Sequence, residues 1–238
     1  MNPDYKDIRI FSFPYAGGNK YAYNNFLPHI PDGLKLVQLE PPGRGARTRE
    51  PLLRDLVAMA TDLFEQVRHR LDTPYVFYGH SMGSWLAYLV THMIREHQLP
   101  MPEHLFFTGS GNPSYYRPKV LKHLLDQDAF FQHLVELGGI TPEVHADKSL
   151  LKYFEPVIRA DFEAVERYQH QSNPMLHIPM TVMIGNREKN IDETAAAAWK
   201  EETMNDFELI VFEGHHFFIN HHLQEIIQRI SDKTLQAI

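Results

Sequence analysis

Cysteine is absent from all 238 residues of the sequence. That absence excludes disulfide frameworks, thiolate metal sites and cysteine nucleophiles, and nothing in the composition points to secretion. No apolar run approaches the roughly 18 residues that a membrane-spanning helix needs. The first residues, MNPDYKDIRIFSF, lack the basic segment, apolar stretch and small-residue cleavage site of a signal peptide. We therefore expect a soluble, cytoplasmic protein that does not associate with membranes.

Positive charge is also in short supply, with 23 Lys and Arg against 30 Asp and Glu and a net charge of −7. Proteins that bind nucleic acids normally present a basic face, so no nucleic-acid partner is expected. Arginines do gather in GRGARTREPLLR, at Arg44, Arg47, Arg49 and Arg54. We expect this stretch to form a solvated loop and helix start rather than a basic binding patch.

Short apolar runs alternate along the chain with helical patterns. The predicted strands are residues 7–13, 34–40, 75–79, 104–109, 180–185 and 207–213, and the predicted helices lie near 53–71, 82–97, 192–203 and 220–236. Strands joined by helices favour right-handed crossovers, so we predict a mainly parallel sheet with helices on both faces.

The segment from about 113 to 177 breaks this alternation, because it contains no convincing strand. PKVLKHLLDQDAFFQHLVELGG and DKSLLKYFEPVIRADFEAVERYQ both predict helices, with Gly138-Gly139 as a stop, Asp147 as an N-cap and Pro156 as a kink or interruption. About 60 residues are too many for a simple connection. We expect one domain, 1–238, with a helical lid insertion at about 113–177; helices that only extend the core are the alternative.

GHSMG, residues 79–83, matches the G-x-S-x-G pattern of a nucleophile elbow. A predicted strand precedes the motif and a predicted helix follows it, which is the context that the pattern requires. Bulk at Gly79 or Gly83 would clash where the backbone turns sharply at the serine. The motif therefore predicts that Ser81 is a nucleophile, whereas a serine that only caps the helix would explain neither glycine.

A serine hydroxyl needs a base within hydrogen-bond reach, and in this arrangement the histidine comes late in the chain. FEGHHFFINHHL places His215 and His216 in the loop after the last strand, and we expect His221 and His222 to ride on the final helix. Spacing alone does not separate His215 from His216.

The third member of such a triad is a carboxylate in the loop GNREKNIDET, after the strand at 180–185. Glu188 lies just beyond the strand, where a carboxylate could reach an imidazole and fix its tautomer. Asp192 is the alternative, although it is also well placed to cap the following helix with Glu193 in the first turn.

An acyl-transfer site also needs donors for a developing oxyanion. The backbone N–H of Met82, directly after the serine, should supply one. FPYAGGNK follows the first strand, and its two glycines permit a tight loop, so the second donor is expected to be the N–H of Ala16, with Tyr15 less favoured. The stretch lacks P-loop spacing, which weakens a phosphate-binding alternative.

With these motifs in order, the chain resembles the type II thioesterases that accompany nonribosomal peptide and polyketide synthases. FPYAGG, LEPPGRGAR, GHSMG, ELGGITPE and a late Trp199…FEGHHFF carry the resemblance almost from end to end. It implies an α/β-hydrolase fold and makes His216, before the two phenylalanines, the catalytic histidine. The family carries aspartate where this chain has Glu188, so Asp192 remains the alternative acid.

The resemblance further implies hydrolysis of acyl thioesters on the phosphopantetheine arm of acyl or peptidyl carrier proteins, with editing of blocked carriers. It implies a monomer without metal or other cofactor, and a lid that shapes an acyl channel near the carrier. We expect Arg117, Lys119 and Lys122 on a solvated face, with an acidic carrier helix as their alternative contact. A general carboxylesterase, small lipase or acyltransferase with the same triad, and a non-catalytic hydrolase-fold binding protein, are the competing functions.

Overall fold

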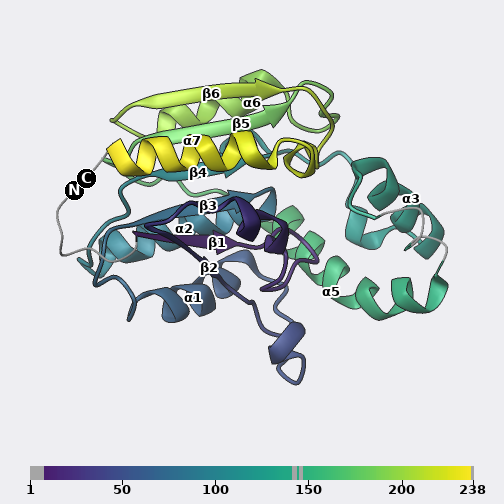
Figure 1. Ribbon diagram of the computed structural model, residues 1–238. Helices are drawn as coiled ribbons and strands as arrows, with labels where there is room; N and C mark the ends of the chain where they lie inside the picture. The colour runs from purple at the N-terminus through teal and green to yellow at the C-terminus, as the bar shows by residue number, and fades with distance from the viewer. Residues whose placement is uncertain (1–7, 141–143, 145–146, 237–238) are drawn as a thin grey trace.

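Six parallel strands form one sheet in the computed structural model, which describes residues 8–140, 144 and 147–236 (Figure 1). The strands are β1 (Ile8–Phe13), β2 (Leu34–Gln38), β3 (Tyr75–His80), β4 (Leu105–Thr108), β5 (Met180–Gly185) and β6 (Phe207–Phe212). Their order across the sheet is β2-β1-β3-β4-β5-β6, and every pairing is parallel. The predicted α/β fold with a parallel sheet is confirmed.

The middle strands are apolar along their whole length because both faces of the sheet are covered. All residues of β3, β4 and β5 are buried, whereas β6, at the edge of the sheet, buries only Phe212. Register positions the site: Phe13 pairs with Gly79, so the ends of β1 and β3 lie side by side.

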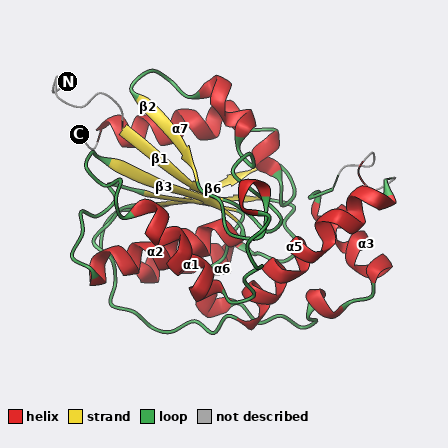
Figure 2. Cartoon of the chain, turned by 90° about the horizontal axis from the view of Figure 1, so that it is seen from below, coloured by secondary structure: helices red, strands yellow, loops and turns green. Residues whose placement is uncertain are grey.

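Helices cover both faces of the sheet (Figure 2). On one face lie α1 (Leu56–Val67), α2 (Met82–Glu96) and α6 (Glu193–Ala197); the other carries α7 (Leu223–Gln236) and the short 3₁₀ helix at Asn24–His29. Each layer has its own buried apolar cluster against the sheet. In α1 the buried side chains recur every three or four residues, as the sequence predicts.

The bounds of three helices depart from prediction. Helix α1 begins at Leu56 rather than near 53 because the Asp55 carboxylate accepts the Ala58 N–H at 2.7 Å. The helix predicted at 192–203 is split into α6 and a 3₁₀ helix, Ala198–Glu202. The final helix begins at Leu223, so the prediction that His221 and His222 ride on it is wrong; both precede it.

The segment between β4 and β5 is helical, as predicted, and lies beyond the carboxyl ends of the strands (Figure 1). Its main helices are α3 (Gln127–Leu137) and α5 (Lys148–Arg167), preceded by 3₁₀ turns at Pro113–Tyr115 and Lys122–Leu124. The helix predicted from 118 begins only at Gln127, where Asp126 caps it, and it ends at Gly138 in the left-handed conformation. The last residues of ELGGITPE, 141–143, and the first predicted strand residue, Asp7, lie outside the described residues.

Helix α5 starts directly after its predicted cap, Asp147, and continues through Pro156. Of the predicted kink or interruption at Pro156, the interruption does not occur. Together α3 and α5 enclose a third apolar cluster, separate from the two that pack on the sheet. Within the described residues, no helix is long and apolar enough to cross a bilayer.

Candidate active site

Ser81 occupies the sharp corner between β3 and α2. Its backbone angles are φ 54° and ψ −120°, in a region that non-glycine residues rarely adopt. The Ser81 N–H donates to the carbonyl of Thr108 at 2.8 Å, which ties the corner to the neighbouring strand. A strained serine held at a strand end is the geometry of a nucleophile elbow.

The two glycines of GHSMG are sterically required, as the sequence predicts. A Cβ on Gly79 would lie 2.3 Å from the backbone of Gly83, and a Cβ on Gly83 would lie 2.1 Å from the carbonyl oxygen of Phe13. Both obstacles are backbone atoms, which cannot move aside cheaply. The close approach of Gly83 to Phe13 also sets α2 directly against the end of β1.

Three side chains form a continuous hydrogen-bonded chain at the carboxyl edge of the sheet. Nε2 of His216 lies 3.0 Å from Oγ of Ser81, and its Nδ1 lies 3.1 Å from both carboxylate oxygens of Glu188. The His216 loop follows β6, and Glu188 follows β5. His216 is 9% exposed and the Glu188 side chain 2% exposed, so bulk water is largely kept from the hydrogen bonds between these two residues.

The structure separates the alternatives that spacing left open. His215 is exposed, and its Nδ1 lies 3.2 Å from the carbonyl oxygen of Arg187. Asp192 caps α6, accepting the N–H of Ala195 at 2.7 Å, and Glu193 lies exposed in the first turn of that helix. Glu188 and His216 are therefore the pair that meets Ser81.

His80, the variable residue before the serine in the motif, packs against His216, with ring centroids 4.9 Å apart. Sequence reasoning missed this residue. Its ring is completely buried, and Nδ1 lies 3.0 Å from Oγ1 of Thr108. Burial, and secondarily charge on His216, lowers the pKa of His80 well below its ordinary value. The uncharged His80 ring thus packs behind the His216 ring. In the sequence, the one sign of this role was the position of His80 at the end of a buried strand.

The expected oxyanion donors lie on two adjacent segments. Met82 is the first residue of α2, where backbone N–H groups have no partner within the helix. Ala16 lies in a turn closed by the Gly18 N–H, which donates to the Tyr15 carbonyl at 2.8 Å. Within the described part of the chain, neither the Ala16 nor the Met82 N–H donates to a protein acceptor. Both are available to a ligand.

Tyr23 joins the two donor segments, a role that the sequence did not suggest. Its hydroxyl donates to the Phe13 carbonyl at 2.8 Å and accepts the N–H of His80 at 3.2 Å. Phe13 opens the Ala16 loop and His80 opens the serine corner, so one buried hydroxyl holds the two segments together.

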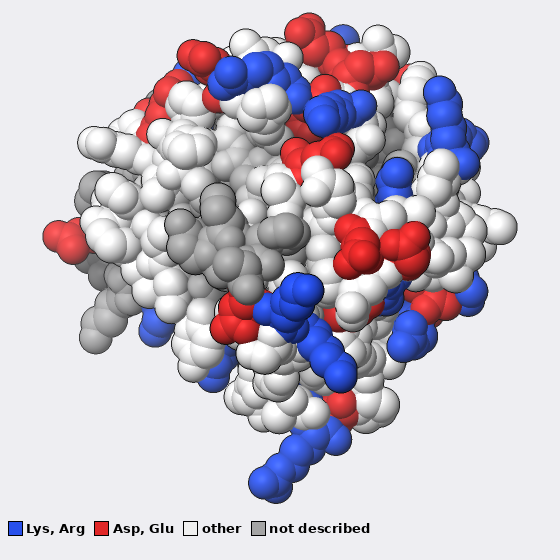
Figure 3. Space-filling model, turned by 90° about the vertical axis from the view of Figure 1, so that its right-hand side faces the viewer, with Lys and Arg blue, Asp and Glu red and all other residues white. Residues whose placement is uncertain are grey.

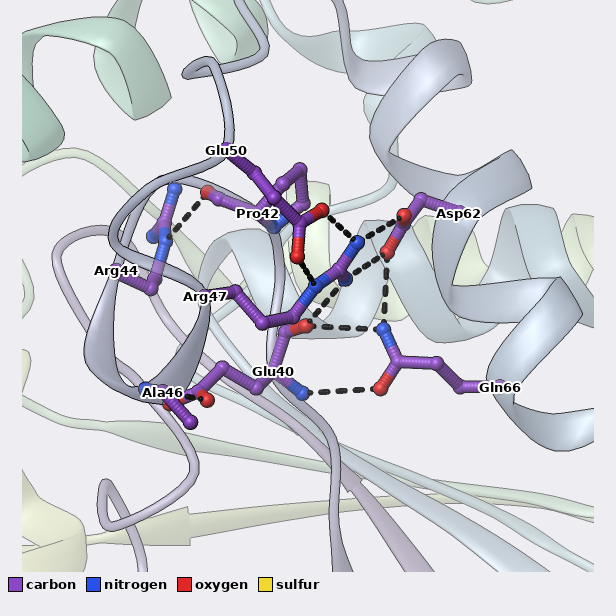
Figure 4. A network of polar contacts seen from close by, with 8 residues as sticks. All are labelled: Glu40, Pro42, Arg44, Ala46, Arg47, Glu50, Asp62 and Gln66. Carbon is purple, nitrogen blue, oxygen red and sulfur yellow. Dashed lines mark hydrogen bonds and ion pairs between the residues drawn. The ribbon is translucent and has the colours of Figure 1, made fainter.

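The arginine-rich stretch is not simply a solvated loop. Arg44 is 4% exposed, so the expectation is wrong there, although Arg49 and Arg54 are exposed as predicted. Arg47 is bonded to Asp62, to Glu50 and to the carbonyl of Glu40 (Figure 4). The hydrogen bonds that Arg47 donates to Asp62 and, secondarily, to Glu50 raise the pKa of its guanidinium. This network pins the loop after β2 to α1.

A charged cavity of about 150 Å³ opens beside Glu188 and His216. Lys122 and His133 line it from the insertion, and Lys189 lines it from the loop after β5. Arg117 and Lys119 are exposed, as expected, whereas Lys122 is half-buried. Across the end of the molecule that carries α3 and α5, basic and acidic side chains are interspersed (Figure 3).

A family model described as "Thioesterase domain" matches residues 8–234. The chain belongs to the thioesterase family. This thioesterase is 29% identical over 221 residues to the gramicidin S biosynthesis protein GrsT of Aneurinibacillus migulanus. The aligned region covers 93% of this chain and 86% of that protein.

Solved structures similar to this chain are also thioesterases. The RedJ thioesterase from the prodiginine pathway of Streptomyces coelicolor has a TM-score of 0.90 and 30% identity, covering 95% of this chain and 90% of that one. YbtT, a type II thioesterase from the yersiniabactin NRPS/PKS pathway, has a TM-score of 0.85 and 26% identity, covering 100% and 96%. Within its family, the thioesterase described here is of type II, from the nonribosomal peptide and polyketide group.

Proposed function

We propose that this thioesterase hydrolyses acyl thioesters carried on the phosphopantetheine arm of acyl or peptidyl carrier proteins, with Ser81 as nucleophile. The hydrogen-bonded chain from Ser81 through His216 to Glu188 is the observation that carries this proposal. The type II family supports the substrate class, because its members work beside synthases that hold their intermediates as carrier-bound thioesters.

In the acylation step, the Ser81 oxygen attacks the thioester carbonyl and His216 Nε2 takes the hydroxyl proton. The carbonyl oxygen becomes an oxyanion that the Met82 and Ala16 N–H groups stabilise. Glu188 holds the imidazole in the tautomer that accepts at Nε2 and offsets the positive charge that develops on the ring. Collapse of the intermediate breaks the carbon–sulfur bond, and the thiolate leaves as a thiol with the proton from His216.

Deacylation uses the same groups in the second half of the cycle. A water gives a proton to His216 and adds to the acyl-serine carbonyl, again under the two N–H groups. Collapse returns the proton to Ser81 and frees the carboxylic acid. Each proton moves between the imidazole and an adjacent oxygen or sulfur atom, so the cycle balances without a redox cofactor.

We further propose that residues 1–238 form one domain in which about 113–177 acts as a lid. Support comes from the placement of α3 and α5 at the carboxyl edge and from the share that Lys122 and His133 take in the cavity beside Glu188. A lid there would shape the channel for the acyl chain and lie near the docked carrier.

Turnover of matched substrates tests the proposal. The same acyl group is offered as an acyl-carrier thioester, an acyl-CoA and a nitrophenyl ester, with Ser81→Ala as the inactive control. We expect the carrier thioester to give the highest kcat/KM. Preference for oxygen esters would favour a general esterase. Failure of a fluorophosphonate to label Ser81 in folded protein would favour a binding protein.

A further inference from the structure

Asp161 and Arg44 form a buried ion pair between α5 and the loop after β2. Arg44 Nη1 lies 2.5 Å from Asp161 Oδ2, and Nη2 lies 2.7 Å from Oδ1, so the contact is bidentate. The two side chains are 4% and 0% exposed. Burying both charges is costly and gives a protein little net stability, so such a pair calls for a reason beyond folding.

The same two residues hold the loop that carries Ala16. The Gly17 N–H donates to Asp161 Oδ2 at 2.7 Å, and Arg44 Nη1 donates to the Gly18 carbonyl at 3.2 Å. Both contacts fall on the residues directly after Ala16. The Ala16 N–H shares its peptide plane with the Tyr15 carbonyl, and that carbonyl accepts the Gly18 N–H at 2.8 Å. Holding Gly17 and Gly18 in place therefore restrains the direction of the Ala16 N–H.

Helix α5 belongs to the insertion and packs both against α3 and against the body of the protein. Ile158 packs with the apolar cluster of α3 and α5, whereas Ala164 belongs to the cluster beneath the sheet. Asp161 lies between them. Contact with the Ala16 loop is close here, since a Cβ on Gly17 would lie 2.8 Å from Cγ1 of Ile158.

We propose that Asp161, supported by Arg44, is a positioning residue that aligns the Ala16 N–H for the oxyanion. This inference rests on the proposed function and deepens it. The N–H is aligned while α5 is docked against the loop, so the insertion completes the oxyanion site as well as covering it. A shift of α5 that separates Asp161 from Gly17 releases the donor.

The test compares Asp161→Asn with wild type on an acyl-carrier thioester. Removing a whole oxyanion donor typically costs about 10²- to 10³-fold in kcat. Misaligning one should cost less, and we expect kcat to fall about 10- to 100-fold with KM changed less than about threefold. The affinity for an alkyl trifluoromethyl ketone, whose hemiketal with Ser81 carries an oxyanion, should fall in parallel. A purely structural role would not couple these two readouts.

Glu163→Gln is the matched control. Glu163 lies on the same helix and pairs with Arg54 at 2.7 Å, so it links α5 to the same arginine-rich stretch without touching the Ala16 loop. We expect kcat and ketone affinity within about twofold of wild type. An equal loss in Glu163→Gln would overturn the proposal, because it would reflect general loosening of α5.

Folding is checked by thermal unfolding of each variant. If Asp161→Asn is unfolded, Arg44→Met combined with Asp161→Leu replaces it, since removing both charges leaves neither buried alone. The same fall in kcat and ketone affinity is expected for this double variant. A folded variant with unchanged kcat refutes the positioning role alone, whereas a wild-type protein without turnover refutes the proposed function together with it.

Discussion

Both carboxylate oxygens of Glu188 lie 3.1 Å from Nδ1 of His216. A glutamate thus meets the imidazole where the family resemblance led us to expect aspartate. Asp192, the other carboxylate that the sequence offered, is engaged in capping α6.

Glu188→Ala is expected to lower the acylation rate about 10³- to 10⁴-fold, because the imidazole loses the group that fixes its tautomer. Asp192→Ala should leave this rate within a few-fold and lower stability by about 1 kcal/mol through loss of a helix cap. Stopped-flow release of thiol measures the rate, and denaturant titration measures the stability. The opposite ranking would identify Asp192 as the acid.

His216→Ala should abolish turnover, whereas His215→Ala should retain most of it. Of these two histidines, His216 reaches Ser81, whereas His215 is exposed and faces the carbonyl of Arg187. The rate of Ser81 labelling by a fluorophosphonate, mapped by mass spectrometry, gives the comparison directly. Equal losses in the two variants would contradict the assignment.

Gly83→Ala should destabilise the fold by about 3 kcal/mol or more, because its Cβ would strike the Phe13 carbonyl, a backbone atom. Gly33→Ala is the control for conformational strain alone: Gly33 has φ +86° but open space around it. Its cost should be about 1 kcal/mol. Urea titration of both variants separates the two effects, and similar costs would argue against the steric explanation.

Stability should fall as the pH is lowered from about 6.5 towards 4. Burial lowers the pKa of His104 to about 3 and that of His92 to about 4, so both are neutral in the folded protein. The unfolded chain, with ordinary histidine pKa values near 6.5, binds more protons across this window, and each histidine costs roughly 1 to 2 kcal/mol at pH 5. The free energy of unfolding at pH 7.5 and pH 5 measures the loss. His104→Gln should reduce this pH dependence, and an unchanged slope would count against His104 as a source.

The sequence predicted best where local chemistry dictates structure. The apolar strands, the glycines around Ser81, the helix N-cap at Asp147 and the helix stop at Gly138 follow from patterning and backbone sterics within a few residues. It predicted less where distant segments meet. Nothing in the local sequence around Arg44 indicates a partner 117 positions away.

The same limit applies to the choices within the site. His215 and His216 are adjacent, and only the packing of their loop decides which ring turns towards Ser81. Tyr23 and His80 act through contacts between neighbouring strand ends, which depend on the order of strands in the sheet. Helix boundaries moved by a few residues where a side-chain cap, such as Asp55, began the helix later than the apolar pattern suggested.

All the strands run in one direction, so β1, β3, β5 and β6 finish at the same edge. Each reacting group therefore leaves the sheet on a separate loop, and none is part of the strand pairing. A loop can lengthen, shorten or exchange aspartate for glutamate while the layers behind it keep their register. The loops that carry the reactive groups can therefore change in sequence while the pairing of the strands, and with it the fold, stays the same.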